Sequence, residues 1–179
     1  MFGRKAPEAV RLYYRDIVKP GVTFRQETIT AIDPDKKRVT TESGVYDADV
    51  LVVALGADYD PGATPGLVEG GNEFYSVPGA ERLRQVLPNF SQGRAIVGVT
   101  STPFKCPPAP CEAAMLLEEW LTTRGQRDRS SVTLVHPWGT PVPPSPDGST
   151  AILQRFEERG ITFLGDRAIT HIDPAAKTV

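Results

Sequence analysis

The sequence predicts an α/β protein with a parallel sheet, and three observations lead to this prediction. Residues 49–54 and 95–99 are apolar runs of strand length, which are typical of strands buried on both faces of a parallel sheet. Short alternating segments between residues 27 and 47 indicate a β-meander. A block of the second half also repeats a block of the first half, which indicates two similar units.

Composition limits the classes of function. The 179 residues are 40% hydrophobic and 23% charged, which is typical of a soluble globular protein. The net charge of −2 excludes the basic excess expected of a protein with a nucleic-acid partner. No apolar run approaches the ~20 residues of a membrane span, and the N-terminal residues lack the apolar core of a signal peptide. Two cysteines form no disulfide framework, so we expect a reducing compartment.

The first half is expected to begin with a charged helix and to continue in strands. Pro20-Gly21 ends the helix, and turns at residues 34–37 and 43–44 separate the strands of the meander. The elements expected there are a helix over 7–19, a short strand at 22–24, the meander strands 27–33, 38–41 and 45–47, and a buried strand over 49–54.

The second half is expected to alternate strands and helices. Gly125 and Gly160 follow amphipathic segments and are expected to end helices, and Ser149 is expected to cap the last helix. Residues 127–129 are expected to form a solvated turn. The elements expected there are a loop over 58–79, helices over 80–87, 111–124 and 149–159, strands at 95–99, 131–135, 161–163 and 168–172, and a stiff loop over 137–146.

The internal repeat consists of two blocks in the same order. Gly21-Val-Thr-Phe24 corresponds to Gly160-Ile-Thr-Phe163, and Ile29-Thr-Ala-Ile-Asp-Pro34 corresponds to Ile169-Thr-His-Ile-Asp-Pro174. Asp33 and Asp173 therefore occupy equivalent turns, where they are expected to form the turn rather than to act as acids. We interpret the repeat as a duplication.

The repeat also predicts that the chain is a piece of a longer protein. The first copy of the repeat continues into the strand 49–54, whereas the second copy is preceded by a strand, a loop and a helix. We expect residues 1–90 to be the back part of one α/β unit and residues 91–179 to be the front part of a second.

The segment Asp47-Ala-Asp-Val-Leu-Val-Val-Ala-Leu55-Gly56-Ala57 resembles a flavin-binding motif. In flavoproteins with two dinucleotide-binding domains, a meander runs into a strand that ends in a turn glycine close to FAD. The resemblance implies three-layer, Rossmann-like FAD/NAD(P)-binding units, truncated here at both ends. Leu55 stands where the family usually has threonine, and the Gly-x-Gly-x-x-Gly fingerprint that would hold the FAD pyrophosphate is absent.

The loop Pro103-Phe-Lys105-Cys106-Pro-Pro-Ala-Pro-Cys111-Glu112 is the more specific feature. It resembles the redox-cysteine loop of the sulfide:quinone oxidoreductases and of the flavoprotein subunit of flavocytochrome c sulfide dehydrogenase, which belong to the pyridine nucleotide-disulfide oxidoreductase superfamily. In that family a glutamate follows the cysteine by six residues, as Glu112 follows Cys106. Cys111 departs from the family, which commonly has an aromatic residue there, and no partner cysteine follows in this chain.

The resemblance implies an enzyme that passes electrons from sulfide or another sulfur substrate to FAD and on to a quinone or cytochrome. It implies catalytic roles for Cys106 and Glu112. It implies FAD contacts by the residues Ile29, Leu55, Gly56, Ala57, Pro103 and Lys105. It also implies a cytoplasmic protein or one peripheral at the membrane, with a homo-oligomer as an open alternative. This piece by itself is expected to bind FAD weakly or not at all and to be inactive.

The residues of the loop support this chemistry. Cys106 lies just before a predicted helix N-terminus and follows Lys105, and both the helix N-terminus and the lysine favour a thiolate. The alternative is that Cys106 is a small buried hydrophobic residue. Glu112 is a candidate for proton handling, although a glutamate in a first helical turn is also favourable by itself. Cys111 is expected to be a packed side chain, with a Cys106–Cys111 disulfide as the alternative.

Two other functions remain open from the sequence. An NAD(P)H-dependent oxidoreductase is one, although the prolines of the 103–110 loop remove amide donors that a pyrophosphate needs. A catalytically silent interaction domain is another, in which residues 141–146 would be a polyproline ligand for an SH3-like module. The isolated His136 and His171 fit no zinc-site spacing.

Overall fold

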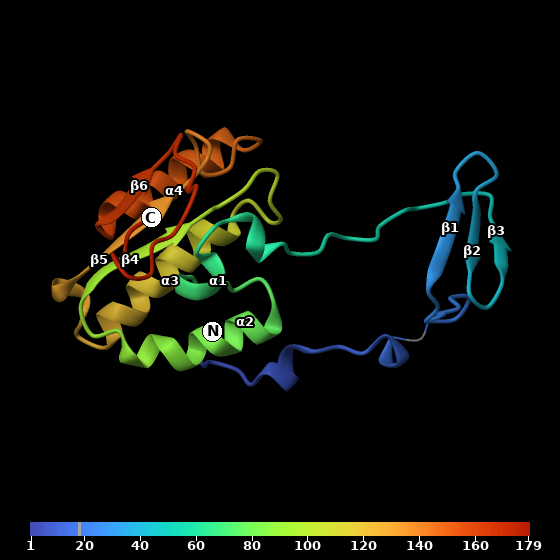
Figure 1. Cartoon of the computed structure of the whole chain (residues 1–179), viewed down its shortest axis with the longest axis horizontal. Helices are drawn as coiled ribbons and strands as arrows, with labels where there is room; N and C mark the ends of the chain where they lie inside the picture. Colours follow the sequence, from blue (N-terminus) through green and yellow to red (C-terminus); the bar gives the residue numbers. More distant parts are fainter. Residues whose placement is uncertain (18) are drawn as a thin grey trace. The chain divides into compact units, whose positions relative to one another are not determined.

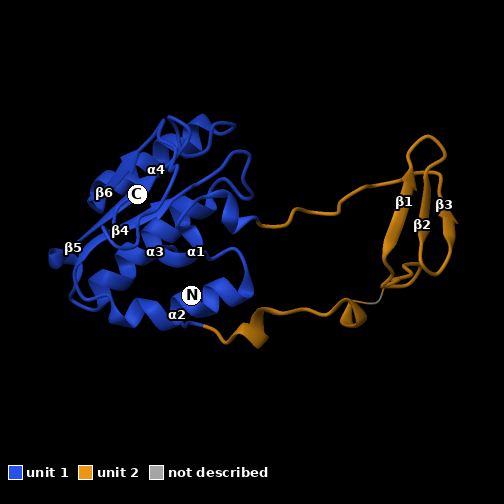
Figure 2. Cartoon of the chain, viewed as in Figure 1, with its two compact units in different colours: residues 1–4, 60–179 blue, residues 5–59 orange. Residues whose placement is uncertain are grey.

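The computed structural model describes residues 1–17 and 19–179, so Val18 of the expected first helix lies outside the described residues. The chain divides into two compact units, which Figure 2 colours separately. One unit consists of Met1–Arg4 and Asp60–Val179, and the other consists of Lys5–Tyr59. Along the sequence the boundary between the two units lies at residues 59–60, whereas the duplication boundary that the sequence predicts near residue 90 stays a prediction.

The larger unit contains the predicted parallel sheet. Its strands β4 (Gly93–Gly98), β5 (Ser130–Val135) and β6 (Ile161–Leu164) lie in the order β4-β5-β6, and both pairings are parallel. Helix α3 (Ala109–Thr123) connects β4 to β5, and α4 (Pro146–Glu158) connects β5 to β6 (Figure 1). The α/β prediction is confirmed, and the β-α-β-α-β order is the one that parallel strands require, because each needs a crossover connection.

Short elements lie in the region that was expected to be a loop. Helix α1 (Leu67–Gly70) and the first residues of α2 (Val77–Val86) occupy part of the range 58–79. The hydroxyl of Ser76 accepts a hydrogen bond from the Gly79 amide, so α2 begins before the expected residue 80 because it has a serine cap. The 3₁₀ turns in this unit are η3 (Pro61–Ala63), η4 (Leu87–Asn89) and η5 (Arg127–Arg129).

The core of the larger unit lies between the sheet and its two crossover helices. Leu121 and Ala114 of α3 meet Val132 and Leu134 of β5, and Phe156 of α4 completes the contact. All five side chains are at most 1% exposed. Burial of each large apolar side chain stabilises the folded state by about 1.5–3 kcal/mol. The core thereby holds in place the strand ends that carry the loops.

A buried ion cluster connects α3 to the end of α4. The Glu118 carboxylate lies 3.2 Å from the Arg159 guanidinium and 3.7 Å from that of Arg127. Arg127 also donates to the carbonyls of Ser130, Arg159 and Gly160 at 2.6–2.9 Å. The prediction of a solvated turn at 127–129 is therefore wrong for Arg127, because its guanidinium donates to the carbonyls of Arg159 and Gly160, which are distant in the sequence.

The start of α4 also differs from the prediction. The helix begins at Pro146 after Ser145, and Ser149 lies inside it at 3% exposure. The Ser149 hydroxyl accepts from the Val142 amide at 3.0 Å and donates to the Val142 carbonyl at 2.9 Å. Ser149 thus fastens the 137–146 loop, in which Pro141 is fully buried. An ordered loop is confirmed there, and it leaves Pro141 inaccessible to an SH3-like module.

The smaller unit contains the predicted meander. Strands β1 (Ile29–Asp33), β2 (Arg38–Thr41) and β3 (Val45–Asp47) pair antiparallel in sequence order. The expected helix over 7–19 is wrong for its described residues, because only the 3₁₀ turns η1 (Pro7–Val10) and η2 (Tyr14–Asp16) form. Residues 22–24 form no strand. Apolar side chains of this region are largely exposed, with Val10 at 63% and Leu12 at 83%, and propensity alone does not stabilise a short helix.

The expected buried strand over 49–54 is also wrong in this structure. These residues form no helix or strand, and Val50 and Val52 are 75% and 79% exposed. A strand of a parallel sheet exists only where neighbours satisfy its backbone groups, and none of the described strands pairs with this segment. Residues 168–172 likewise form no strand, because only an isolated bridge between Asp173 and Thr178 follows β6.

The internal repeat has a structural counterpart in the two turns. Asp33 pairs with Arg38 across the first turn, and Asp173 bridges to Thr178 across the second. The Asp33 carboxylate accepts from the Lys36 amide, and the Asp173 carboxylate accepts from the amides of Ala175 and Ala176. Lys37 and Lys177, at equivalent positions, have φ angles of 51° and 55°. The prediction that both aspartates form turns is confirmed.

Candidate functional site: the cysteine loop

The loop that carries Cys106 lies at the carboxyl end of the parallel sheet. It leaves β4 after Gly98 and enters α3 at Ala109. In open α/β sheets the crevice outside the carboxyl ends of the strands is where ligands bind. The sequence-predicted position of the loop, between a strand and a helix, is therefore confirmed.

Cys106 is exposed, and its backbone is left-handed with φ = 54°. A left-handed conformation at a residue other than glycine costs about 1–3 kcal/mol and persists only where the surroundings impose it. The Cys106 carbonyl accepts from the Ala109 amide at 2.9 Å, which turns the chain into α3. The alternative that Cys106 is a buried hydrophobic residue is excluded.

Two contacts fix the residues that precede Cys106. The Tyr75 hydroxyl donates to the Lys105 carbonyl at 2.6 Å. The Phe104 ring lies 4.8 Å from the Trp138 ring and 5.6 Å from the His136 ring, with the latter pair edge to face. Pro103 follows a cis peptide bond and is exposed, as is Lys105.

Glu112 and Cys111 lie in the first turn of α3 in different environments. Glu112 is exposed, and its amide donates to the Pro108 carbonyl at 3.0 Å. Cys111 is 1% exposed, and burial raises the pKa of its thiol to about 11. Both cysteines are free, so the packed role expected for Cys111 is confirmed and the Cys106–Cys111 disulfide does not form.

The residues expected to contact FAD divide between the two units. Pro103 and Lys105 belong to the cysteine loop, whereas Ile29 and residues 55–57 belong to Lys5–Tyr59. Ile29 pairs with Thr41 in the meander. Gly56 has φ = 75° and open space where a Cβ would be, so its backbone permits the close approach of a flat ligand. The pyrophosphate fingerprint is absent from the sequence, so these residues fit only part of FAD.

Sequence reasoning did not assign Tyr75, His136 and Trp138, which support the loop. His136 and Trp138 directly follow β5, at the same carboxyl end of the sheet as the cysteine loop. That position was a usable signal, because neighbouring parallel strands end at one edge. Tyr75 carried no comparable signal, since its contact depends on the folding of residues 60–79.

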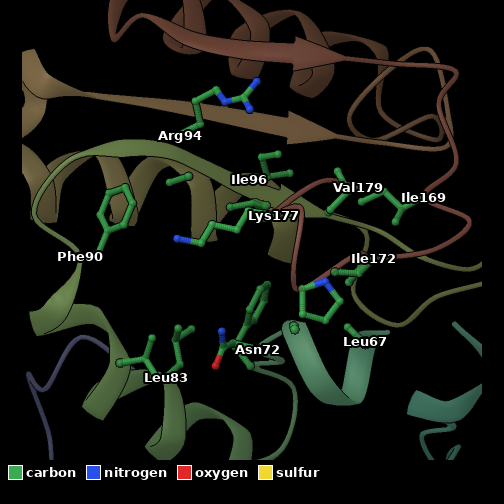
Figure 3. Close-up of a pocket in the computed structure, with 18 of the residues that line it drawn as sticks. Leu67, Asn72, Leu83, Phe90, Arg94, Ile96, Ile169, Ile172, Lys177 and Val179 are labelled. Atoms are coloured by element: carbon green, nitrogen blue, oxygen red, sulfur yellow. The ribbon is translucent and has the colours of Figure 1, made fainter. Parts of the chain in front are cut away.

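A cavity of about 610 Å³ lies along β4, on the side of that strand without a neighbouring strand. Figure 3 shows Arg94 and Ile96 of β4, Leu83 of α2, and Ile172 and Lys177 of the C-terminal segment around it. The lining is mainly apolar, and none of the predicted site residues contributes to it. The cavity reaches the first residues of the cysteine loop at Thr100, whereas Cys106 is not one of its lining residues.

The described residues contain neither a metal-binding cluster nor a membrane-spanning helix. Within residues 1–17 and 19–179, no cluster of three or more His, Cys, Asp or Glu side chains could bind a metal ion. No helix in the same residues has the length and apolar character to cross a membrane.

Comparison with known proteins identifies relatives in one group of enzymes. The chain is 29% identical over 130 residues to the mitochondrial sulfide:quinone oxidoreductase of Mus musculus, which is 69% of this chain and 29% of the relative. It is 40% identical over 87 residues to an NADH dehydrogenase-like protein of Mycobacterium tuberculosis, which is 48% of this chain and 22% of the relative. No family model matches the chain.

Solved structures give the same grouping. The sulfide:quinone oxidoreductase of Aquifex aeolicus matches 83% of this chain and 36% of its own, with a TM-score of 0.61 and 25% identity. A NAD-dependent persulfide reductase from A. fulgidus has a TM-score of 0.51 at 18% identity, which supports the fold alone. The chain thus spans about a third or less of the length of these relatives.

Proposed function

The homologues of this chain are sulfide:quinone oxidoreductases and related FAD-dependent oxidoreductases, and from this relationship we propose that it is part of an enzyme of that kind. The enzyme passes electrons from a sulfur substrate through Cys106 to FAD and on to an acceptor. Residues 1–90 supply the back part of the FAD-binding unit, and residues 91–179 supply the front part of a second unit.

The observation that supports the proposal is the geometry of the cysteine loop. The loop occupies the position where a dinucleotide-binding unit carries its glycine-rich turn, at the carboxyl end of β4. In this chain the loop presents an exposed, free thiol in a fixed left-handed conformation. An exposed thiol can exchange with sulfur species, whereas a buried one such as Cys111 cannot.

Each residue has a defined part in the proposed reaction. Cys106 Sγ would form an S–S bond to the sulfur of a sulfide substrate as one S–H bond of each breaks, and the two electrons released would pass to bound FAD. Glu112, six residues further along and exposed, would receive one of the protons. Bound FAD would supply the acceptor for two electrons. The family resemblance assigns FAD contacts to Ile29, Leu55, Gly56, Ala57, Pro103 and Lys105, and this assignment stays a prediction.

The quinone acceptor of the proposal rests on relatives whose names include it, namely sulfide:quinone oxidoreductases and a type II NADH:quinone oxidoreductase. Peripheral attachment to a membrane, where a quinone dissolves, follows from the same proposal. A cytochrome is the alternative electron acceptor. Association into a homo-oligomer is a separate alternative for the protein partner.

A second candidate is an NAD(P)H-dependent enzyme, which the similarity to the NADH dehydrogenase-like protein favours. Two features of the larger unit oppose it. Prolines remove amide donors from the loop after β4. The residue after β5 is the buried His136 rather than the carboxylate that would bind a ribose hydroxyl.

The test uses a full-length protein that contains this chain, with Cys106→Ser and, as the matched control, Cys111→Ser. We expect Cys106→Ser to lower sulfide-dependent quinone reduction by more than ~100-fold, because the exchanging thiol is lost. Cys111→Ser should leave the rate within ~3-fold, because the buried thiol makes no contact with substrate. The flavin absorbance at 450 nm, unchanged in both variants, checks that FAD remains bound.

A parental rate of sulfide oxidation by Cys106→Ser would contradict the proposal. NADH as the electron donor provides the second arm of the experiment. If NADH reduces the flavin quickly and sulfide does not, the NAD(P)H-dependent candidate is correct.

A further inference from the structure

Four aromatic rings lie together where β5 and β6 end. Phe104 comes from the cysteine loop, His136 and Trp138 come from the segment after β5, and Phe163 comes from β6. His136 is central, with ring centres 5.6 Å from Phe104, 5.5 Å from Trp138 and 5.7 Å from Phe163. The pair His136 and Trp138 is called the aromatic clasp below, because both rings contact Phe104.

Backbone hydrogen bonds fix the clasp to the sheet. The His136 amide donates to the Leu164 carbonyl at 2.9 Å, and the Arg167 amide donates to the His136 carbonyl at 3.0 Å. His136 Nδ1 lies 3.3 Å from the Trp138 amide nitrogen and 3.2 Å from the Trp138 carbonyl oxygen. The position of the clasp therefore follows from β5 and β6, which contribute Val132, Leu134 and Ile161 to the buried core.

The imidazole of His136 has no polar role in the described structure beyond that local contact. The residue is 0% exposed, and its Nε2 atom has no hydrogen-bond partner among the described residues. A buried polar atom without a partner is rare in folded proteins. What the ring offers its neighbours is therefore its apolar face and edge, and the edge-to-face contact with Phe104 is the one that reaches the cysteine loop.

We propose that the aromatic clasp positions Cys106, and this inference rests on the redox role proposed above for that thiol. Phe104 is fixed by the clasp, and Lys105 is fixed by the Tyr75 hydroxyl, so the chain reaches Cys106 from two fixed residues. On the other side the Ala109 amide binds the Cys106 carbonyl. The left-handed conformation of Cys106 is imposed by these restraints, and it holds the thiol outward at the ligand-binding edge of the sheet.

The test uses the 179-residue chain with Cys111→Ala as the reference, so that Cys106 is its only thiol. A small trifluoromethyl ketone label on Cys106 gives a ¹⁹F NMR signal, and trypsin cleavage after Lys105 measures opening of the loop. The added substitutions are His136→Ala, His136→Phe and, as a control outside the clasp, His171→Ala, which changes an exposed histidine.

The reference is expected to give one narrow ¹⁹F resonance and slow cleavage after Lys105. His136→Ala should give several or broadened resonances and raise that cleavage rate at least tenfold. His136→Phe should restore a single resonance and a cleavage rate within twofold of the reference, because a phenyl ring keeps the contact with Phe104. His171→Ala should match the reference in both measurements.

A second trypsin cleavage site, after Arg94, distinguishes a loss of Cys106 positioning from a general loss of stability. If His136→Ala only weakens the fold, cleavage after Arg94 in β4 should rise in parallel with cleavage after Lys105, and this result would overturn the proposal. It is also overturned if His136→Ala leaves the ¹⁹F signal unchanged, or if His136→Phe behaves as His136→Ala does. Neither readout needs flavin or turnover, so the outcome is independent of the result for Cys106→Ser in the full-length protein.

Discussion

Two thiols five residues apart in the sequence have opposite chemical settings. Cys106 precedes α3 on an exposed, left-handed turn, and Cys111 faces the core from the first turn of α3. Burial in apolar surroundings disfavours a thiolate, which is why the pKa of Cys111 rises to about 11 from its ordinary value of 9.0. Only one of the two sulfur atoms is therefore suited to exchange with a substrate near neutral pH.

Alkylation measures this difference directly. With iodoacetamide at pH 8, we expect Cys106 to react in the folded chain and Cys111 to stay unmodified, as mass spectrometry of the Cys106→Ser and Cys111→Ser variants can show. Both thiols should react in 6 M guanidinium chloride, which is the control for reagent and time. Rapid modification of Cys111 in folded Cys106→Ser would show that the packing of α3 is wrong.

The same pKa shift predicts how stability depends on pH. The folded pKa of Cys111 lies above the unfolded one, so its contribution is complete below pH 9 and is lost as the pH rises through about 11. Between these values the free energy of unfolding should fall more steeply for the unsubstituted chain than for Cys111→Ala. Urea titrations of the unsubstituted chain and of Cys111→Ala at pH 8, 9.5 and 10.5 give the difference in their free energies of unfolding. The titration of other groups cancels in that difference. Parallel pH profiles would exclude the shift.

At the scale of elements, carboxylates on one helix differ in what they connect. Glu118 of α3 lies 8% exposed between Arg127 and Arg159 and also accepts from the Thr122 hydroxyl at 2.8 Å. It thereby ties α3 to the end of α4. Its neighbour Glu119 pairs with Arg4 at 2.5 Å on the surface. Buried and exposed ion pairs contribute differently to stability, because removal of one partner of a buried pair leaves an uncompensated charge.

The substitutions Glu118→Gln and Glu119→Gln form a matched pair on this helix. Glu118→Gln is expected to lower the free energy of unfolding by about 2–4 kcal/mol, since it leaves two partly buried guanidinium groups without their carboxylate. Glu119→Gln should cost less than about 1 kcal/mol. Urea denaturation of both variants at one pH gives the comparison. If both substitutions lowered the free energy of unfolding by the same amount, the ion cluster around Glu118 would be solvated.

At the scale of the whole molecule, the two units differ in how much of their apolar sequence they bury. The larger unit has a sheet covered by α3 and α4, and its central residues are inaccessible to solvent. The smaller unit has a three-stranded meander and an apolar segment, residues 49–54, that is exposed. Relatives of which this chain matches only about a third of the length contain additional chain with which such a segment can pair.

Hydrogen exchange tests this interpretation of the segment. In the 179-residue chain, the amides of residues 50–54 should exchange at nearly the rate of an unstructured peptide, whereas those of β5 should be protected. In a full-length protein that contains the chain, the same amides should become protected, because a complete sheet satisfies their backbone groups. Absence of protection in both proteins would exclude a strand at this position.

The features that the sequence predicted well depend on contacts between near neighbours. The meander follows from alternation and turn residues, and Asp33 and Asp173 bind amides two or three residues ahead. Helix α3 follows from its apolar spacing, and the place of the Cys106 loop follows from the strand and the helix on either side of it. These interactions are specified within a few residues, so a pattern in the sequence is sufficient to find them.

What only the tertiary structure decided depends on residues far apart in the chain. The partners of Arg127 include carbonyls of Arg159 and Gly160, and the ring of His136 meets Phe104 from another loop. The segment 49–54 has the sequence of a buried strand, yet it is exposed because burial requires a neighbouring sheet. The sequence by itself determined the α/β class, the repeat and the thiol loop. The restraints that hold the thiol come from contacts between distant segments, which no local pattern encodes.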